Sequence, residues 1–382
     1  MMKISQTSPL LALCSAALSL PVNSANQPVQ TEVSIKTSSY LERDLSESDV
    51  LLGETERYDI NINQFRLLTP VSGAWSLGVD ISRETMSGAS PWGTVAGVDG
   101  EASLIMSGAT ISEKRTEIAL SATHYGQNAS YSVGVIRSEE NDYEATAVRL
   151  GGEWDQNNGL STLSLGLSYS SEDIEPTDAE IFGRVTKEDK NVVSTSVSWT
   201  QVLDKASTLQ IGASVSRHSG FLSDPYKLRD VRPDEKLAWS LNLRYRRYFD
   251  NQNAALHLDY RYYSDDFGVD SQTLYAAWYK NLGTRFQLAP NVRFYSQAES
   301  DFYLTVDDYS LPTDDNQSTD YRLSSYGAYT FGLKAIFNEI NWSVNISVDR
   351  YISAGKYETS SGKGHPALVS FNMASIGFDL RF

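Results

Sequence analysis

The chain has little of the chemistry that thiols, imidazoles and basic patches supply. It holds one cysteine and four histidines among 382 residues. Cys14 lies inside an N-terminal apolar stretch, so the remainder of the chain cannot form a disulfide, a thiolate metal site or a cysteine nucleophile. The 32 Lys and Arg are outnumbered by 48 Asp and Glu, and the net charge of -16 argues against nucleic acid as a partner. The histidines fall in different segments without metal-ligand spacing: His124, His218, His257 and His365.

Motifs of common catalytic and cofactor sites are also missing. The chain contains no Gly-x-Gly-x-x-Gly, phosphate-binding loop, His-Glu-x-x-His or Gly-x-Ser-x-Gly sequence. We therefore expect neither an enzyme activity nor a bound cofactor. A serine and histidine pair brought together only by folding is the alternative.

Long apolar runs are absent after residue 25, so the sequence predicts no transmembrane helix. Before that point, Lys3 precedes an apolar stretch over 10–22 and the small residues Ser24 and Ala25. This order is typical of a secretory signal peptide, and the stretch is too short to span a bilayer. We predict a signal peptide over 1–25, cleaved near Ala25, and an exported domain over 26–382. A buried N-terminal strand or helix is the alternative.

The sequence is rich in β-forming residues, with 22 Tyr, 13 Phe and 7 Trp. Apolar and polar residues alternate strictly near the C-terminus, which is the period of a strand with one apolar face. The apolar members of this pattern are Ile340, Trp342, Val344, Ile346 and Val348, then Ala374, Ile376, Phe378, Leu380 and Phe382. In a soluble sandwich that face would contact a second sheet, whereas in an outer-membrane barrel it contacts lipid.

The spacing of such segments favours the barrel. We predict sixteen strands, near 31–39, 56–68, 74–83, 113–124, 129–138, 143–154, 160–170, 191–203, 207–217, 236–249, 254–264, 271–281, 285–297, 319–337, 340–350 and 369–382. Short turns alternate with mostly longer loops, which we place outside the cell at 40–55, 84–112, 139–142, 171–190, 218–235, 265–270, 298–318 and 351–368. Barrels separate short periplasmic turns from long external loops in this way. The predicted fold is an all-β transmembrane antiparallel barrel in the outer membrane of a Gram-negative bacterium, with aromatic residues near the strand ends.

The same alternation predicts which side chains line the lumen. If Leu241, Leu243 and Tyr245 face lipid, Arg244 and Arg246 face inward. The predicted lumen-lining residues are Arg244, Arg246, His257, Asp259, Arg261 and Arg293. A turn centred on Asn251 and Gln252 would set Arg244 opposite Asp259, Arg246 opposite His257 and Asn242 opposite Arg261. Such arginines either attract passing anions or form a mutually neutralised network that fills a narrow lumen.

A barrel of sixteen strands normally encloses a water-filled channel. We therefore expect a porin-like channel for small hydrophilic solutes, and the alternative is a plugged barrel with a structural or partner-binding role. The apolar residues Leu104, Ile105 and Met106 of the second external loop would be buried either inside the barrel mouth or against a neighbouring loop. Outer-membrane lipid and lipopolysaccharide are the expected surroundings, and a periplasmic partner is not identified by the sequence.

Acidic loop residues raise a calcium hypothesis, because carboxylate oxygens suit hard cations that bridge to lipopolysaccharide phosphates. Ordinary solvated loops are the alternative, since the spacing is not that of an EF-hand. The residues concerned are Asp307, Asp308, Asp314, Asp315 and Asp320, and, in another loop, Glu139, Glu140, Asp142 and Glu144.

The chain ends in Ser375-Ile376-Gly377-Phe378-Asp379-Leu380-Arg381-Phe382, which resembles the C-terminal signal read by the barrel assembly machinery. Ser375, Gly377, Leu380 and Phe382 occupy the fixed places of that signal. Other stretches resemble an uncharacterised proteobacterial family of outer-membrane barrels, domain of unknown function 3570. They are Ser87-Gly88-Ala89, Ser107-Gly108-Ala109, Ser223-Asp224-Pro225-Tyr226, Arg232-Pro233-Asp234, His257-Leu258-Asp259-Tyr260-Arg261-Tyr262-Tyr263, Arg293-Phe294-Tyr295-Ser296-Gln297, Asp301-Phe302-Tyr303 and Asp320-Tyr321-Arg322-Leu323-Ser324. The resemblance implies an outer-membrane barrel and no particular activity.

Overall fold

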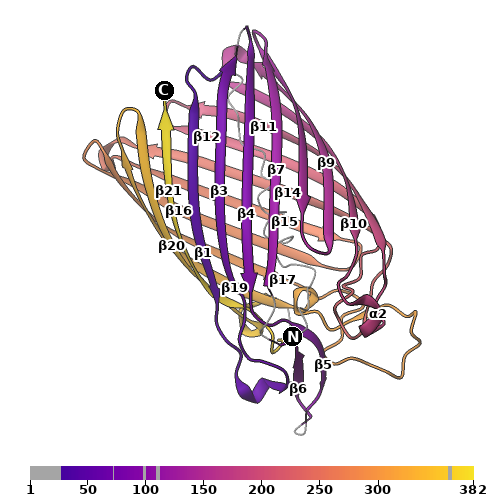
Figure 1. Cartoon of the computed structure of the whole chain (residues 1–382). Coiled ribbons are helices and arrows are strands. Elements are labelled where there is room, and N and C mark those ends of the chain that lie inside the picture. Colours follow the sequence, from indigo (N-terminus) through magenta and orange to yellow (C-terminus); the bar gives the residue numbers. More distant parts are fainter. Residues whose placement is uncertain (1–26, 72, 98–99, 109–111, 360–363) are drawn as a thin grey trace.

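A closed barrel of sixteen antiparallel strands makes up most of the molecule (Figure 1). The computed structural model describes residues 27–382 except 72, 98–99, 109–111 and 360–363, so the predicted signal peptide lies outside the described residues. The barrel strands are β1 (Glu32–Glu42), β3 (Asp59–Val71), β4 (Trp75–Ser87), β7 (Ser112–Tyr125), β8 (Ala129–Glu139), β9 (Tyr143–Gln156), β10 (Ser161–Ile174), β11 (Glu188–Asp204), β12 (Ser207–Gly220), β14 (Glu235–Phe249), β15 (Ala254–Asp265), β16 (Asp270–Leu282), β17 (Phe286–Gln297), β19 (Tyr326–Asn338), β20 (Trp342–Ala354) and β21 (Ser370–Arg381).

The first and last strands close the barrel. β1 pairs with β21 along its whole length, from Glu32 opposite Arg381 to Glu42 opposite Phe371. Backbone hydrogen bonds between Thr31 and Phe382 extend this seam to the final residue, with N···O distances of 2.8 and 3.0 Å. Closure leaves the barrel without an unpaired edge strand, which is the condition for a sheet to lie in lipid.

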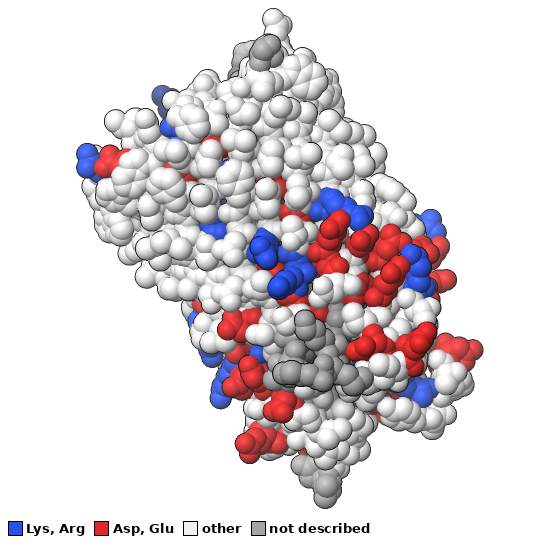
Figure 2. All heavy atoms as spheres, in the orientation of Figure 1, with Lys and Arg blue, Asp and Glu red and all other residues white. Residues whose placement is uncertain are grey.

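Alternation along each strand separates an apolar outer face from a polar inner one. The side chains of Leu165, Leu167 and Tyr169 on β10 are exposed on the outside, and Ser164, Gly166 and Ser168 between them face inward. Figure 2 shows the result on one face of the molecule, where most of the barrel wall is uncharged and the acidic and basic residues gather toward the loop end. Among the described residues, no helix is long and apolar enough to cross a membrane.

Connections differ in length at the two ends of the barrel. Short turns lie at the end that holds the C-terminus, and the longer loops gather at the opposite end, with α2 (Ala179–Phe182) among them (Figure 1). Two small sheets form within these loops: β2 (Val50–Leu52), β5 (Pro91–Ala96) and β6 (Ala102–Met106), and separately β13 (Asp230–Val231) with β18 (Gln317–Ser318). The 3₁₀ turns are η1 (Glu47–Asp49), η2 (Asn157–Gly159), η3 (Asp250–Gln252), η4 (Tyr321–Leu323) and η5 (Gly355–Tyr357).

The predicted strand count and barrel class are confirmed, but some predicted strands begin too early, and the largest difference is at the strand predicted over 319–337. The predicted strand over 319–337 corresponds to β19, which starts at Tyr326. The carboxylate of Asp320 accepts a hydrogen bond from the backbone N–H of Arg322 and caps η4 there. Several other strands extend into predicted loops. β4, for example, runs to Ser87, and β5 and β6 lie inside the predicted loop over 84–112.

The register of β14 and β15 is the predicted one. Arg244 lies opposite Asp259, Arg246 opposite His257 and Asn242 opposite Arg261. The turn differs from a tight two-residue hairpin, because η3 is followed by Asn253 in the left-handed region, with φ of 45°. Phe249 and Ala254 form the last pair, so the turn consists of the four residues 250–253. Its centre still lies between Asn251 and Gln252, and the register is therefore the predicted one.

Surface labelling tests which end faces outward. We expect a cysteine at the exposed position Ser310 to react with a membrane-impermeant maleimide on intact cells, and a cysteine at Gln252 to react only after permeabilisation. Ser90 is an unsuitable external probe because its side chain is buried in the loops. Cells expressing the unaltered chain are the control, and labelling of Gln252→Cys but not Ser310→Cys on intact cells would reverse the topology.

Candidate functional site

Four arginines line one part of the inner wall. Arg244 and Arg246 come from β14, Arg261 from β15 and Arg293 from β17, and we call this group the arginine wall. Each alternates with outward residues such as Leu243, which is 41% exposed on the other face. The structure therefore brings together the arginines that the sequence places on the inner face.

Asp259 pairs with an arginine diagonal to it rather than the one opposite. Its Oδ1 lies 2.5 Å from Nη1 of Arg246, and both side chains are 31% exposed. Arg244, directly opposite in register, instead donates to Oε1 of Gln210 on β12 at 3.2 Å. Asp259 therefore neutralises one arginine of the wall. Among the described residues, the other three arginines of the wall form no ion pair within 4.0 Å.

Aromatic rings stand beside the remaining inward residues of this wall. The guanidinium carbon of Arg261 lies 5.6 Å from the ring centre of Tyr263, and that of Arg293 lies 5.5 Å from the ring centre of Tyr295. The ring of His257 packs 4.4 Å from that of Tyr279. These neighbours hold the cationic groups against the wall without cancelling their charge.

A second charged region, which the sequence analysis did not identify, lies on β4, β7 and β9. We call it the carboxylate wall, and it consists of Asp80, Glu117, Glu153 and Asp155. Arg66 lies 3.8 Å from Asp80, and the two side chains are 46% and 51% exposed although both face inward. Glu117 pairs with Arg115 at 2.6 Å, and Arg149 is a further inward cation on β9. Exposure of paired charges on the inner face indicates space for water inside the barrel.

The wall between these regions carries small side chains. The inward positions of β10, β11 and β12 include Ser164, Gly166, Ser168, Ser194, Ser196, Ser198, Gly212, Ser214 and Ser216, which we call the serine wall. Their outward neighbours, such as Val197 and Ile211, are more than 40% exposed. Because short side chains project little, they leave room on this side of the lumen.

The external loops pack against one another above the lumen. We call the described residues of 43–58, 88–108, 221–234, 298–325 and 364–369 the loop cap. Leu228 N–H donates to the carbonyl of Trp92 at 2.7 Å, and Asp307 N–H donates to that of Thr94 at 2.8 Å. Leu104 and Met106 are buried with Ala89 and Ala367. The apolar residues of the second loop thus contact neighbouring loops.

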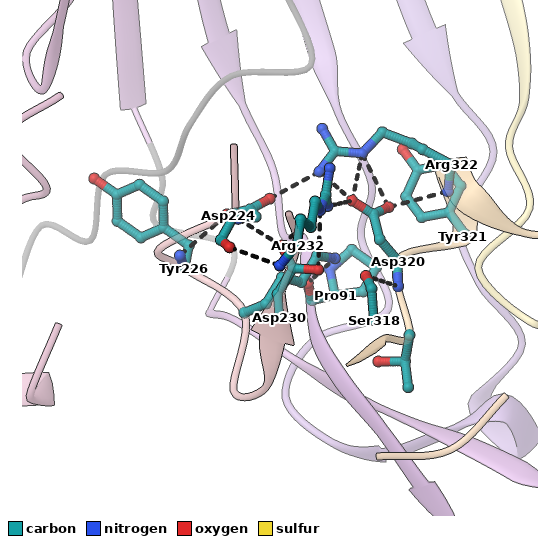
Figure 3. Close-up of polar contacts among 12 residues, drawn as sticks. Pro91, Asp224, Tyr226, Asp230, Arg232, Ser318, Asp320, Tyr321 and Arg322 are labelled. Carbon is teal, nitrogen blue, oxygen red and sulfur yellow. Dashed lines mark hydrogen bonds and ion pairs between the residues drawn. The ribbon is translucent and has the colours of Figure 1, made fainter. Parts of the chain in front are cut away.

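A buried carboxylate links two segments of the cap, 221–234 and 298–325 (Figure 3). Asp320 is 0% exposed and accepts hydrogen bonds from Nε of Arg322 at 2.8 and 2.9 Å and from Nη2 of Arg232 at 2.9 Å. Arg322 also donates to Asp224 at 2.8 Å. Burial opposes ionisation of Asp320, but Arg322, Lys227 and Arg232 together hold its pKa well below the usual value.

The acidic loops do not form the calcium site considered from the sequence. Among the described residues, no group of three or more His, Cys, Asp or Glu side chains is placed to hold a metal ion. Asp320 is neutralised by arginines, and Asp307 accepts a hydrogen bond from Thr319 at 2.9 Å. Both are buried, so the alternative of a wholly solvated acidic loop is also wrong for these two residues.

Another buried carboxylate lies at the hairpin between β8 and β9. The side chain of Glu140 is 1% exposed, and Nε of Arg115 lies 3.7 Å from its Oε1. Burial, followed by the nearby charges of Asp142, Glu113 and Glu84, raises the pKa of Glu140 to about 8, although Arg115 lowers it. Burial likewise raises the pKa of Asp307 to about 6.

We predict that the loop end becomes less stable as the pH rises from 5 to 8. A carboxyl group whose folded pKa exceeds its unfolded value binds its proton more tightly when folded, so its contribution falls as the pH rises through that interval. Glu140→Gln should remove the larger part of this dependence, of the order of a few kcal/mol. This pH dependence of local stability is measured by hydrogen exchange of the backbone amides near Glu140 at pH 6 and 8. Glu139→Gln is the matched control because Glu139 is 60% exposed, and equal slopes in the two variants would contradict the assignment.

Two histidines lie beside hydroxyl groups, but in one pair the histidine is not oriented as a base. Nδ1 of the buried His365 accepts the Ala367 N–H at 3.0 Å, which leaves Nε2 as the donor toward Thr94 Oγ1 at 3.2 Å. Burial lowers the pKa of His365 to about 3, so its ring is neutral near pH 7. His218 lies 3.3 Å from Ser216 on the same strand.

Comparison with known proteins agrees with the fold. A family model described as "Protein of unknown function (DUF3570)" matches residues 10–371. No curated protein matches the chain. Among solved structures, CdiB from Acinetobacter baumannii has a TM-score of 0.53 at 10% identity over 92% of this chain, which spans 60% of the length of CdiB.

Two further solved structures are matched over all or nearly all of their own length, with lower TM-scores. A bacterial polysaccharide outer membrane secretin has a TM-score of 0.49 at 10% identity, with 94% of this chain and all of that chain covered. OccD3 from Pseudomonas aeruginosa has a TM-score of 0.44 at 10% identity, with 96% of each chain covered. At 10% identity the likeness to CdiB shows the barrel fold alone.

Proposed function

Since the chain belongs to this family of proteins of unknown function, DUF3570, we propose its role from the site: a porin-like channel for small hydrophilic solutes. The observation that carries the proposal is the exposure of Arg66 and Asp80, about half of each side chain, on the inner face. Charged groups keep such exposure only where water has access, and sixteen strands normally enclose an aqueous lumen.

Its location follows from the same features. The outward apolar bands require lipid, and we place the barrel in the outer membrane, surrounded by lipid and lipopolysaccharide. Export by a cleaved signal peptide over 1–25 and recognition of Ser375, Gly377, Leu380 and Phe382 by the barrel assembly machinery complete the proposal. An enzyme activity is not part of it, because the sequence carries no His-Glu-x-x-His or Gly-x-Ser-x-Gly motif and the histidine nitrogen that faces Thr94 is a donor.

The loop cap favours a second candidate, a plugged barrel with a structural or partner-binding role. Lys227 donates to the carbonyl of Pro91 at 2.7 Å, and β13 pairs with β18, so separate loops are joined by direct bonds. A cap held this tightly would restrict passage from the outside. Conductance distinguishes the candidates, because only an open lumen passes ions.

Ion selectivity tests the role of the arginine wall. We expect Arg244→Ala to shift the reversal potential in planar bilayers toward cations, and Asp259→Ala to shift it toward anions because Arg246 then loses its partner. The effect on stability should be small, about 0.2 to 1 kcal/mol for a cross-strand pair. Ser240→Ala, also inward on β14, is the matched control. Unchanged selectivity in both charge variants would contradict the proposal.

A further inference from the structure

The two charged regions of the lumen lie on opposite sides of the barrel. In the closed strand order, β15 is eight places from β4 among sixteen strands, which puts Asp259 and Arg261 across the lumen from Asp80. From this placement we infer that the channel selects small zwitterionic solutes, such as α-amino acids, over uncharged solutes of the same size. The inference rests on the proposed channel function.

Each of the two regions keeps a net charge when its inward cations are counted against its inward carboxylates. On β14, β15 and β17, four arginines and Lys236 face inward against two carboxylates, those of Asp259 and Asp265. On β3, β4, β7 and β9, six inward carboxylates outnumber three arginines. They are Asp80, Glu84, Glu113, Glu117, Glu153 and Asp155, against Arg66, Arg115 and Arg149. One side of the lumen is therefore net positive and the other net negative.

The serine wall fills one of the two arcs between these regions. Its hydroxyl groups and glycines carry no charge and project little into the lumen, and Glu172 and Lys190 on the same arc form an ion pair. The other arc, β19 to β1, adds little net charge because its inward cations and carboxylates nearly balance: Lys36, Lys334 and Arg381 against Glu32, Glu42, Asp349 and Asp379. A solute that passes beside the serine wall has cations on one side and carboxylates on the other.

Such an arrangement produces a field across the lumen rather than along it. Low-dielectric walls focus the field of fixed charges into the water between them. An uncharged solute displaces water that this field has oriented and gains nothing in return. A zwitterion places its carboxylate toward the arginines and its ammonium toward the carboxylates, and so replaces that water. An ion of one sign is attracted by one wall and repelled by the other.

Swelling of proteoliposomes loaded with the full chain tests the inference with L-threonine and erythritol, a zwitterion and a neutral polyol of similar size. We expect L-threonine to enter about fivefold faster at low ionic strength, the ratio that about 1 kcal/mol gives. The ratio should fall toward one at high salt, because about 1 M salt shortens the screening length to about 3 Å.

Three multiple variants identify the cause. Removal of charge from the arginine wall uses Arg244→Gln, Arg261→Gln and Arg293→Gln; removal from the carboxylate wall uses Asp80→Asn, Glu117→Gln and Glu153→Gln. In either charge-removal variant, L-threonine and erythritol should enter at equal rates, and erythritol should still enter. The matched control changes Ser168, Ser196 and Ser214 to Ala and should keep the preference.

Each contrary outcome has a distinct meaning. Entry of both solutes at equal rates in the unaltered chain would overturn the inference and leave the channel intact. Loss of the preference in the serine-wall control would also overturn it, because the charged walls would not be its cause. If neither solute enters, the proposed channel fails and the inference fails with it.

Discussion

Replacement of Phe382 by Ser, or its deletion, is expected to remove most of the folded barrel from the outer membrane. The side chain is 66% exposed, and only its backbone is bonded, to Thr31. Loss of this one outward side chain should lower the free energy of unfolding by no more than about 1.5 to 3 kcal/mol, the value of burying one large apolar side chain in lipid, and should leave the barrel folded. A large effect in cells would therefore arise before folding is complete, when the terminal strand is recognised.

Two comparisons separate recognition from stability. Phe382→Ser protein should still refold in detergent to the heat-modifiable barrel, and Phe382→Tyr should assemble in cells because it keeps the aromatic ring. Ile340→Ser is the matched control, since Ile340 is 91% exposed at a neighbouring turn outside the terminal strand. Normal amounts of heat-modifiable, protease-resistant barrel in a Phe382→Ser strain would overturn the assignment.

Replacement of Asp320 by Asn is expected to open the loop cap while the barrel stays folded. The change leaves Arg232 and Arg322 without the carboxylate that both contact, and removal of one partner from a buried ion pair typically costs about 3 to 5 kcal/mol. The depressed pKa of Asp320 means that its contribution is present above the ordinary pKa of 3.8 and is lost only in stronger acid. The effect of the substitution should therefore be constant between pH 5 and 8.

Limited proteolysis of intact cells measures this opening. Cleavage within 298–325 should become faster, and the heat-modifiable mobility of the barrel should not change. Asp315→Asn is the matched control because Asp315 lies exposed in the same segment. If Asp320→Asn and Asp315→Asn are cleaved at the same rate as the unaltered chain, the ion pairs around Asp320 do not hold the cap together.

Much of the barrel could be predicted because alternation is a local property. Strand faces follow from residues two apart, so Arg244 and Arg261 could be placed inside from their neighbours alone. The same reasoning applied to β4 and β7 would have found Asp80 between Val79 and Ile81, and Glu117 before Ile118. The carboxylate wall was therefore predictable from the alternation of residues on these strands.

Contacts between distant segments could not be read in this way. Asp320, Tyr321 and Arg322 alternate as a strand would, yet the Asp320 side chain caps a 3₁₀ turn and meets Arg232 from another loop. The ion pair of Asp259 also depends on the length and direction of arginine side chains, which register alone does not determine. The loop cap is built from such interactions, so its role became apparent only from the structure.

Single-channel recording in planar bilayers tests the central claim most directly. The purified full chain should insert in discrete steps of ionic current, and Asp320→Asn should give larger or longer openings because its cap is released. Stepwise currents whose selectivity changes with Arg244→Ala would support a channel through the lumen. Absence of steps from both the unaltered chain and Asp320→Asn, with folding of each confirmed by heat modifiability, would show that the lumen does not conduct.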